Sequence, residues 1–168
     1  AKHPRYARAI MTSYILGIDI GGTNLSLVVC DAQNRPIWDT TIPTIPANGF
    51  DDVVRRCVEA SAPAWSQFPI SAVGVAAAAQ VDPATGIIIT SPNLGFTDVP
   101  LADALTSHFR VPVHVANDVN AAALGESVAQ PNAAQPLLAV FVGTGVGAGL
   151  IVRGRIYEGA AGFAAEIG

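Results

Sequence analysis

The chain has 168 residues, which suits a single domain, and its net charge of −4 does not favour binding to a polyanion such as DNA. Hydrophobic residues make up 51% of the chain, yet no apolar run reaches the roughly 18 residues that a membrane-spanning helix needs. Neither a nucleic-acid partner nor a membrane partner is therefore expected.

Residues 1–13 are expected to form a flexible tail ahead of a folded domain over residues 14–168. The tail carries a small basic cluster and no signal-peptide pattern. The two cysteines, Cys30 and Cys57, lack the spacing of metal ligands, and both are expected to be buried thiols. Low cysteine use fits a cytoplasmic location.

The hydrophobic pattern predicts an α/β order of elements. Strands are expected at Tyr14–Ile20, Leu25–Cys30, Pro36–Ile45, Ile70–Ala77, Ile87–Thr90, Val111–Val115, Leu137–Val142 and Ala148–Val152. Helices are expected from Asn48 or Gly49 to near Pro63, over Leu101–Phe109 and over Asn117–Ala129. Because a tight turn joins the first two strands, they should form a hairpin, and the sheet should be mixed. The expected fold is an α/β domain with a five-stranded mixed sheet, flanking helices and a second strand hairpin near the end.

Two glycine turns stand between predicted strands, at Gly21-Gly22-Thr23 and at Gly143-Thr144-Gly145. Glycine allows a bulky anion to approach the backbone N–H groups, and threonine adds a hydroxyl donor. Asp19 ends the strand before the first turn, and a carboxylate beside a phosphate makes sense if Mg²⁺ lies between them. For either turn alone, a plain tight hairpin remains an alternative.

The segment from Gly143 to Ala148 also fits the G-x-G-x-x-A pattern of dinucleotide-binding proteins. That pattern must open a helix, whereas the residues that follow here read as a strand. A nicotinamide or flavin cofactor is therefore not expected.

Asn117 and Asp118 lie where a predicted strand ends and a helix begins, the place where α/β proteins gather ligands. One alternative is a helix cap, in which a side-chain oxygen accepts from the first N–H groups of the helix. The other is a general base, because an aspartate is ionised at neutral pH and can orient a hydroxyl during phosphoryl transfer.

Together these segments resemble the ROK family of sugar kinases and repressors, within the actin and hexokinase superfamily, over about residues 14–168. The motifs that carry the resemblance, in chain order, are Ile18 to Asn24, Ser91-Pro92-Asn93, Asn117-Asp118 with Asn120 to Ala123 and Glu126, Gly143 to Gly147, and Gly162 to Gly168. The resemblance implies a ribonuclease H-like, actin-like ATPase domain.

The resemblance also implies roles for residues. ATP phosphates would be bound by Asp19, Gly21, Gly22, Thr23, Asn24, Gly143, Thr144 and Gly145. Asp19 would hold Mg²⁺ through water. Asp118 would be the catalytic base, and the sugar would contact Gln80, Asn93, Asn117, Asp118 and Glu166. The implied activity is ATP-dependent phosphorylation of a hexose or N-acetylhexosamine.

The sequence departs from the family pattern in two places. Ala76 to Gln80 replaces a glycine-rich loop, which leaves the preferred sugar open. The chain also ends at Gly168, before the family's zinc-binding motif and second domain. Structural zinc is expected only in that missing part, residues 1–168 alone are expected to be inactive, and a homodimer is expected at full length.

Two other functions remain open. A sugar-responsive transcriptional regulator of the same family would carry a helix-turn-helix ahead of Tyr14, where this sequence has only residues 1–13. A fold relative that phosphorylates another acceptor, such as a carboxylate, is the third possibility.

Overall fold

The computed structural model describes residues 13–130, 135–142, 146–159 and 164–165. Its largest sheet has five strands in the order β3-β2-β1-β4-β8. These strands are β1 (Tyr14–Ile20), β2 (Asn24–Cys30), β3 (Pro36–Pro43), β4 (Ile70–Ala77) and β8 (Val113–Asn117). β1 is antiparallel to β2 and parallel to β4, and β4 is parallel to β8, so the predicted mixed sheet is confirmed.

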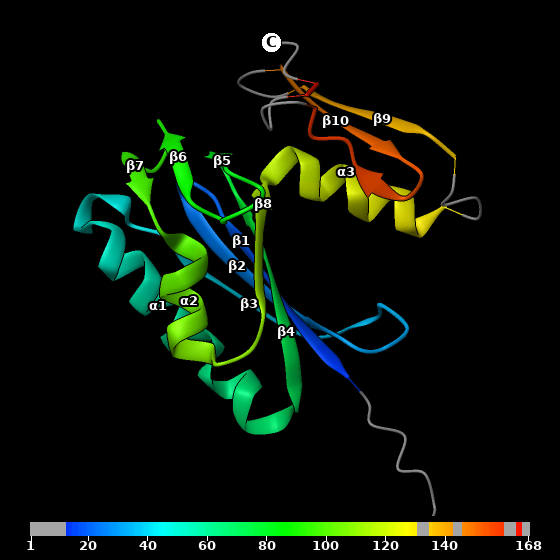
Figure 1. The fold of residues 1–168 in the computed structure, drawn as a ribbon. Helices are drawn as coiled ribbons and strands as arrows, with labels where there is room; N and C mark the ends of the chain where they lie inside the picture. Colours follow the sequence, from blue (N-terminus) through cyan, green and yellow to red (C-terminus); the bar gives the residue numbers. More distant parts are fainter. Residues whose placement is uncertain (1–12, 131–134, 143–145, 160–163, 166–168) are drawn as a thin grey trace, which may run out of the picture.

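Two helices, α1 (Phe50–Gln67) and α2 (Leu101–Phe109), cover one face of this sheet (Figure 1). Along β1, Leu16, Ile18 and Ile20 are buried in the core that these helices close. Side chains alternate between the two faces of a strand. Asp19 therefore points to the opposite face, away from α1 and α2.

A second sheet has the order β11-β10-β9. It consists of β9 (Leu137–Val142), β10 (Val146–Val152) and β11 (Arg155–Ile156). The helix α3 (Asp118–Ala129) leaves the end of β8 and lies along this sheet (Figure 1). The approach is close: a Cβ added at Gly149 would lie 2.5 Å from the Cβ of Ala123. The expected hairpin near the end of the chain is thereby confirmed.

A third, small sheet was only partly predicted. It contains β5 (Gln80–Val81), β6 (Ile88–Ser91) and β7 (Phe96–Val99). Neither β5 nor β7 was expected, because β5 is two residues long and β7 holds Thr97 and Asp98 among few apolar residues. Asp98 even takes a left-handed backbone conformation, with φ of 52°.

Several predicted boundaries were wrong. The helix expected to end near Pro63 continues to Gln67, because its last turn packs Trp65 on Phe109 with ring centroids 5.3 Å apart. Proline lacks an N–H, but the rest of the helix keeps its bonds and its buried face. The strand β3 ends at Pro43 and is followed by the short 3-10 helix η1 (Pro46–Asn48).

The strand β8 was also predicted two residues too early, since it spans Val113–Asn117 rather than Val111–Val115. Pro112, just before it, has no N–H to donate to the sheet.

None of the described helices is long and apolar enough to cross a membrane.

Candidate active site

The carboxyl ends of three parallel strands meet at one edge of the large sheet. Asp19 pairs in register with Ala76, and Ala76 pairs with Ala116. One residue further along, Asn117 ends β8, and Asp118 begins α3. This shared register brings Asp19 and Asp118, which are far apart in sequence, to the same edge.

The two aspartates influence each other electrostatically. The pKa of Asp19 is raised above its ordinary value of 3.8, first by partial burial and then by the negative charge of Asp118. Both causes disfavour the ionised carboxylate. A divalent cation would offset this repulsion, so the residues present fit a hard cation such as Mg²⁺.

The first glycine turn lies directly after Asp19. The Gly21 N–H donates to the carbonyl of Asn24 at 3.0 Å, which closes the turn between β1 and β2. A Cβ added at Gly22 would lie 3.1 Å from the carbonyl oxygen of Asn93. A side chain at this position would crowd the Asn93 backbone, and the close approach places the turn beside Asn93.

Asn117 and Asp118 divide between them the two roles left open by the sequence. The Asn117 Oδ1 accepts from the Asn120 N–H at 3.1 Å and so caps α3. Asp118 Oδ1 accepts from the Val119 N–H at 2.9 Å and from Asn117 Nδ2 at 3.0 Å. Within the described residues, Asp118 Oδ2 accepts no hydrogen bond. Because Asn117 supplies the cap, this second carboxylate oxygen of Asp118 remains available to a ligand.

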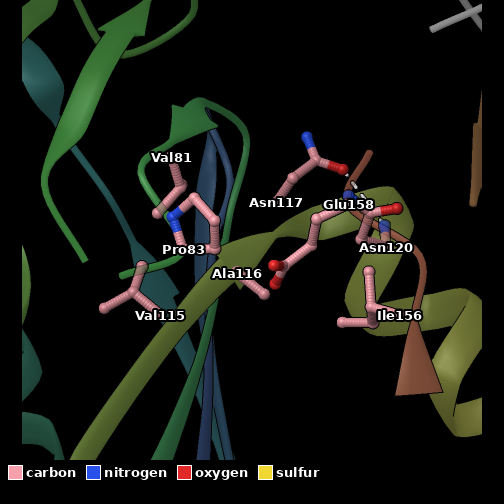
Figure 2. Close-up of a pocket in the computed structure, with 8 residues that line it drawn as sticks. All are labelled: Val81, Pro83, Val115, Ala116, Asn117, Asn120, Ile156 and Glu158. Atoms are coloured by element: carbon pink, nitrogen blue, oxygen red, sulfur yellow. Dashed lines mark hydrogen bonds between the residues drawn. The ribbon is translucent and has the colours of Figure 1, made fainter. Parts of the chain in front are cut away.

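A small pocket opens beside Asn117 (Figure 2). Its apolar wall includes Val115, Ala116 and Ile156, and its polar groups are Asn117, Asn120 and Glu158. Figure 2 shows the Glu158 side chain reaching across this pocket towards Ala116. The Oδ1 of Asn120 is buried, and it has no hydrogen-bond partner among the described residues.

Several predicted site residues can be placed less fully. Gln80 is exposed on β5, next to Ala79, whose carbonyl accepts from Asn117 Nδ2 at 3.1 Å. Asn24 and Thr23 are exposed around the first turn. The remaining predicted site residues, Gly143, Thr144, Gly145 and Glu166, lie outside the described residues.

The surroundings of the second turn are nevertheless described. The turn is followed by β10, so the predicted strand after it is confirmed, although it begins at Val146 rather than at Ala148. A Cβ added at Gly147 would lie 3.0 Å from Cγ2 of Val119. The beginning of β10 therefore touches the residue next to Asp118.

The cysteines take no part in this site. Cys57 is fully buried, and burial raises the pKa of its thiol to about 12. Cys30 is only half-buried, which corrects the expectation of two buried thiols. It lies at the end of β2, where the chain leaves the core for the turn at Asp31. Among the residues that the structure describes, no three His, Cys, Asp or Glu side chains gather as a metal site.

Thr44 and Glu158 were missed by sequence reasoning, and Asn120 was named in a family motif without a role. Thr44 is fully buried and contacts the first glycine turn, although it lies more than twenty positions away. The one available signal was the hairpin register, which places the residue after Pro43 opposite Thr23.

In this α/β domain a glycine turn and the carboxylates of Asp19 and Asp118 lie at the ends of parallel strands, an arrangement typical of the actin-like fold. The sequence profile of the ROK family matches residues 15–168, and the chain therefore belongs to the ROK family.

Individual relatives fall into two functional groups. The glucokinase of Halalkalibacterium halodurans is 32% identical over 161 residues, covering 92% of this chain and 49% of the relative. The xylose repressor of Caldicellulosiruptor bescii is 29% identical over 160 residues, covering 92% of this chain and 40% of the repressor. The chain thus spans about half the length of these relatives or less.

Among solved structures, one similar chain is a ROK family glucokinase from Streptomyces griseus in complex with glucose and AMPPNP. The TM-score is 0.83 and the sequence identity 32%, over 93% of this chain and 50% of that chain. The predicted actin-like fold is therefore confirmed.

Proposed function

We propose that the full-length protein transfers the terminal phosphoryl group of ATP to a hydroxyl of a hexose or an N-acetylhexosamine. The observation that carries this proposal is the meeting of Asp19, Asp118 and the first glycine turn at one edge of the sheet. Glucokinases among the relatives that match most of this chain support it.

Asp118 is the proposed general base. Its Oδ1 is fixed by the Val119 N–H and Asn117 Nδ2, which leaves Oδ2 for the acceptor hydroxyl. In a loose phosphoryl-transfer transition state, the base mainly orients the hydroxyl and accepts its proton late. An ionised aspartate is adequate for this role.

The first glycine turn is the proposed cradle for the nucleotide phosphates, with Gly21, Gly22, Thr23 and Asn24. Asp19 would hold Mg²⁺ through water, and a bound Mg²⁺ would neutralise phosphate charge during the transfer. Gly143, Thr144 and Gly145 are proposed as the second phosphate turn. Contact between Gly147 and Val119 supports this assignment, because it brings the residues that follow that turn next to Asp118.

The acceptor sugar is proposed to lie between Asp118 and the loop that ends β4. Asn117 supports this position, because it is bonded to the Ala79 carbonyl and therefore joins that loop to α3. Gln80, Asn93 and Glu166 are the further proposed sugar contacts.

The same proposal includes a second domain after residue 168, which would hold a zinc site. It also includes a homodimer of the full-length protein and a cytoplasmic location. Leu138, Val140 and Val142 share one face of β9 and are 58%, 50% and 79% exposed. Apolar groups gathered in this way typically mark a surface that another part of the protein covers.

The second candidate function is a sugar-responsive regulator. The xylose repressor that matches 92% of this chain specifically favours it. Such a protein would bind a sugar at the same edge without turning over ATP, and its DNA contacts would come from another module.

The test is a panel of hexoses and N-acetylhexosamines with ATP and Mg²⁺, using the full-length protein and ADP release as the measurement. We expect one or a few sugars to support turnover at rates typical of kinases, about 1–100 s⁻¹. Sugar binding with no ADP release from any sugar would favour the regulator instead.

A further inference from the structure

We propose that Thr44 is a positioning residue of the first glycine turn, where its hydroxyl orients the Gly22 amide towards the phosphates of the bound nucleotide. This inference rests on the proposed phosphate-binding role of that turn. Its evidence is a pair of hydrogen bonds, the burial of one side chain and the geometry of one peptide bond.

Thr44 contacts the turn twice. Its N–H donates to the carbonyl of Thr23 at 2.9 Å, and its hydroxyl donates to the carbonyl of Gly21 at 2.7 Å. The first bond only extends the pairing of β2 with β3 by one residue, and any residue other than proline could make it. The second bond requires a hydroxyl, so it is specific to threonine or serine at this position.

The bond to Gly21 determines where the next amide points. The peptide bond between Gly21 and Gly22 is trans, as are all the described peptide bonds. In a planar trans peptide the C=O and the following N–H point in opposite directions. Because the Gly21 carbonyl is held towards Thr44, the Gly22 N–H is directed away from Thr44.

Two of the three amides of the turn are available to a ligand. Within the described part of the chain, neither the Gly22 nor the Thr23 N–H donates a hydrogen bond. Consecutive unpaired N–H groups in a turn form a concavity that binds anions. On its other side the turn is limited by Asn93, whose carbonyl lies 3.1 Å from the position of a Gly22 Cβ.

The backbone beside Thr44 is strained, which indicates that the surrounding structure holds this segment in place. Ile45 has φ of 55° and ψ of 60°, a left-handed conformation that a β-branched residue rarely adopts, and it precedes Pro46. Such strain persists only where the surroundings impose it. Here the chain turns at Ile45, shortly after the end of β3. The residue just before this turn, Thr44, is 0% exposed.

The test compares variants of the full-length protein in pairs that differ in whether the hydroxyl is present. Thr44→Ser and Thr44→Ala both lose the methyl group, but only serine keeps the hydroxyl. Thr44→Val keeps the shape and loses the hydroxyl. Thr41→Val is the matched control, because Thr41 lies on β3 three residues before Thr44, is exposed, and its hydroxyl donates to the Ser26 hydroxyl at 3.2 Å rather than to the glycine turn.

We expect Thr44→Ala and Thr44→Val to raise KM for ATP about tenfold, the scale of one lost hydrogen bond, with KM for the sugar changed less than about twofold. Thr44→Ser should remain close to the parent, as should Thr41→Val. If Thr44→Val does not fold, the comparison of alanine with serine gives the same information. A KM for ATP that is equal in the alanine and serine variants, or an equal rise in both KM values, would overturn the inference.

Direct titration of ATP into the same variants separates this inference from the proposed function. If the parent binds ATP without phosphorylating any sugar, the kinase proposal fails, and weaker ATP binding by Thr44→Ala than by Thr44→Ser still supports the role of Thr44. If the parent phosphorylates a sugar and all variants bind ATP equally, the role of Thr44 fails alone. A parent that binds no ATP would overturn both.

Discussion

At the scale of single residues, the ionisation of Asp19 gives a direct experimental test of the proposed site. Its pKa is raised by partial burial and by Asp118, so the folded state binds a proton at Asp19 more tightly than the unfolded state does. Ionisation of Asp19 therefore reduces stability as the pH rises above the unfolded value near 3.8.

We expect Asp19→Asn to raise the Tm of the metal-free full-length protein at pH 7 by a few degrees. The gain should shrink as the pH falls towards the ordinary pKa of aspartate, because both states are then protonated in the parent. Differential scanning calorimetry with a chelator present measures this. Asp103→Asn, an exposed position on α2, serves as the control. An Asp19→Asn variant with a lower Tm than the parent at pH 7 would show that the two carboxylates do not repel.

The residue identities of the site could largely be proposed from the sequence, but their contacts could not. Asp19, Asn117 and Asp118 were each found from a local pattern, and Asn93 came only from the family resemblance. The division of the cap and the free carboxylate between Asn117 and Asp118 appeared only with the hydrogen bonds. Thr44 was missed because its importance comes from a contact across strands that no local pattern marks.

At the scale of elements, the contact between α3 and β10 sets where the second hairpin lies relative to Asp118. Gly149 allows this contact, because its Cβ position would be 2.5 Å from the Ala123 Cβ and 3.0 Å from the Val119 carbonyl oxygen. Neither atom can move without displacing α3.

We expect Gly149→Ala to lower the free energy of unfolding by about 1–3 kcal/mol, the usual cost of overpacking. The matched control is Gly125→Ala on α3, where an added Cβ would meet nothing within 4 Å. In a helix interior this change should stabilise by about 0.5–1 kcal/mol. Urea denaturation of the full-length protein measures both, and equal effects of the two substitutions would contradict the close packing of α3 on β10.

Element prediction succeeded where one signal dominated. The strands β1, β2 and β4 are mostly apolar runs, and each was found within one residue of its bounds. It failed where two signals opposed each other. Pro63 predicted an end to α1. The last turn is nevertheless helical, because Trp65 packs on Phe109, a contact that the sequence does not reveal.

At the scale of the whole molecule, the site exists because parallel strands from separate parts of the chain share a register. Asp19 lies one residue before the end of β1, Asn117 ends β8, and β4 lies between these strands and sets the register. The sequence predicted a mixed sheet, but it did not fix the order β3-β2-β1-β4-β8, which decides that these two ends are neighbours.

The central claim is that Asp118 activates an acceptor hydroxyl at this edge, and its most direct test is Asp118→Asn in the full-length protein. An asparagine keeps an Oδ1 that can accept from the Val119 N–H and Asn117 Nδ2, so the fold should be retained. Turnover is measured by ADP release and sugar affinity by calorimetric titration, with Asp103→Asn as the control.

We expect turnover by Asp118→Asn to fall at least about 100-fold, the usual contribution of a positioned base, while the sugar dissociation constant changes less than about threefold. Turnover by Asp118→Asn at the parental rate, with sugar binding intact, would contradict the assignment of Asp118 as the base.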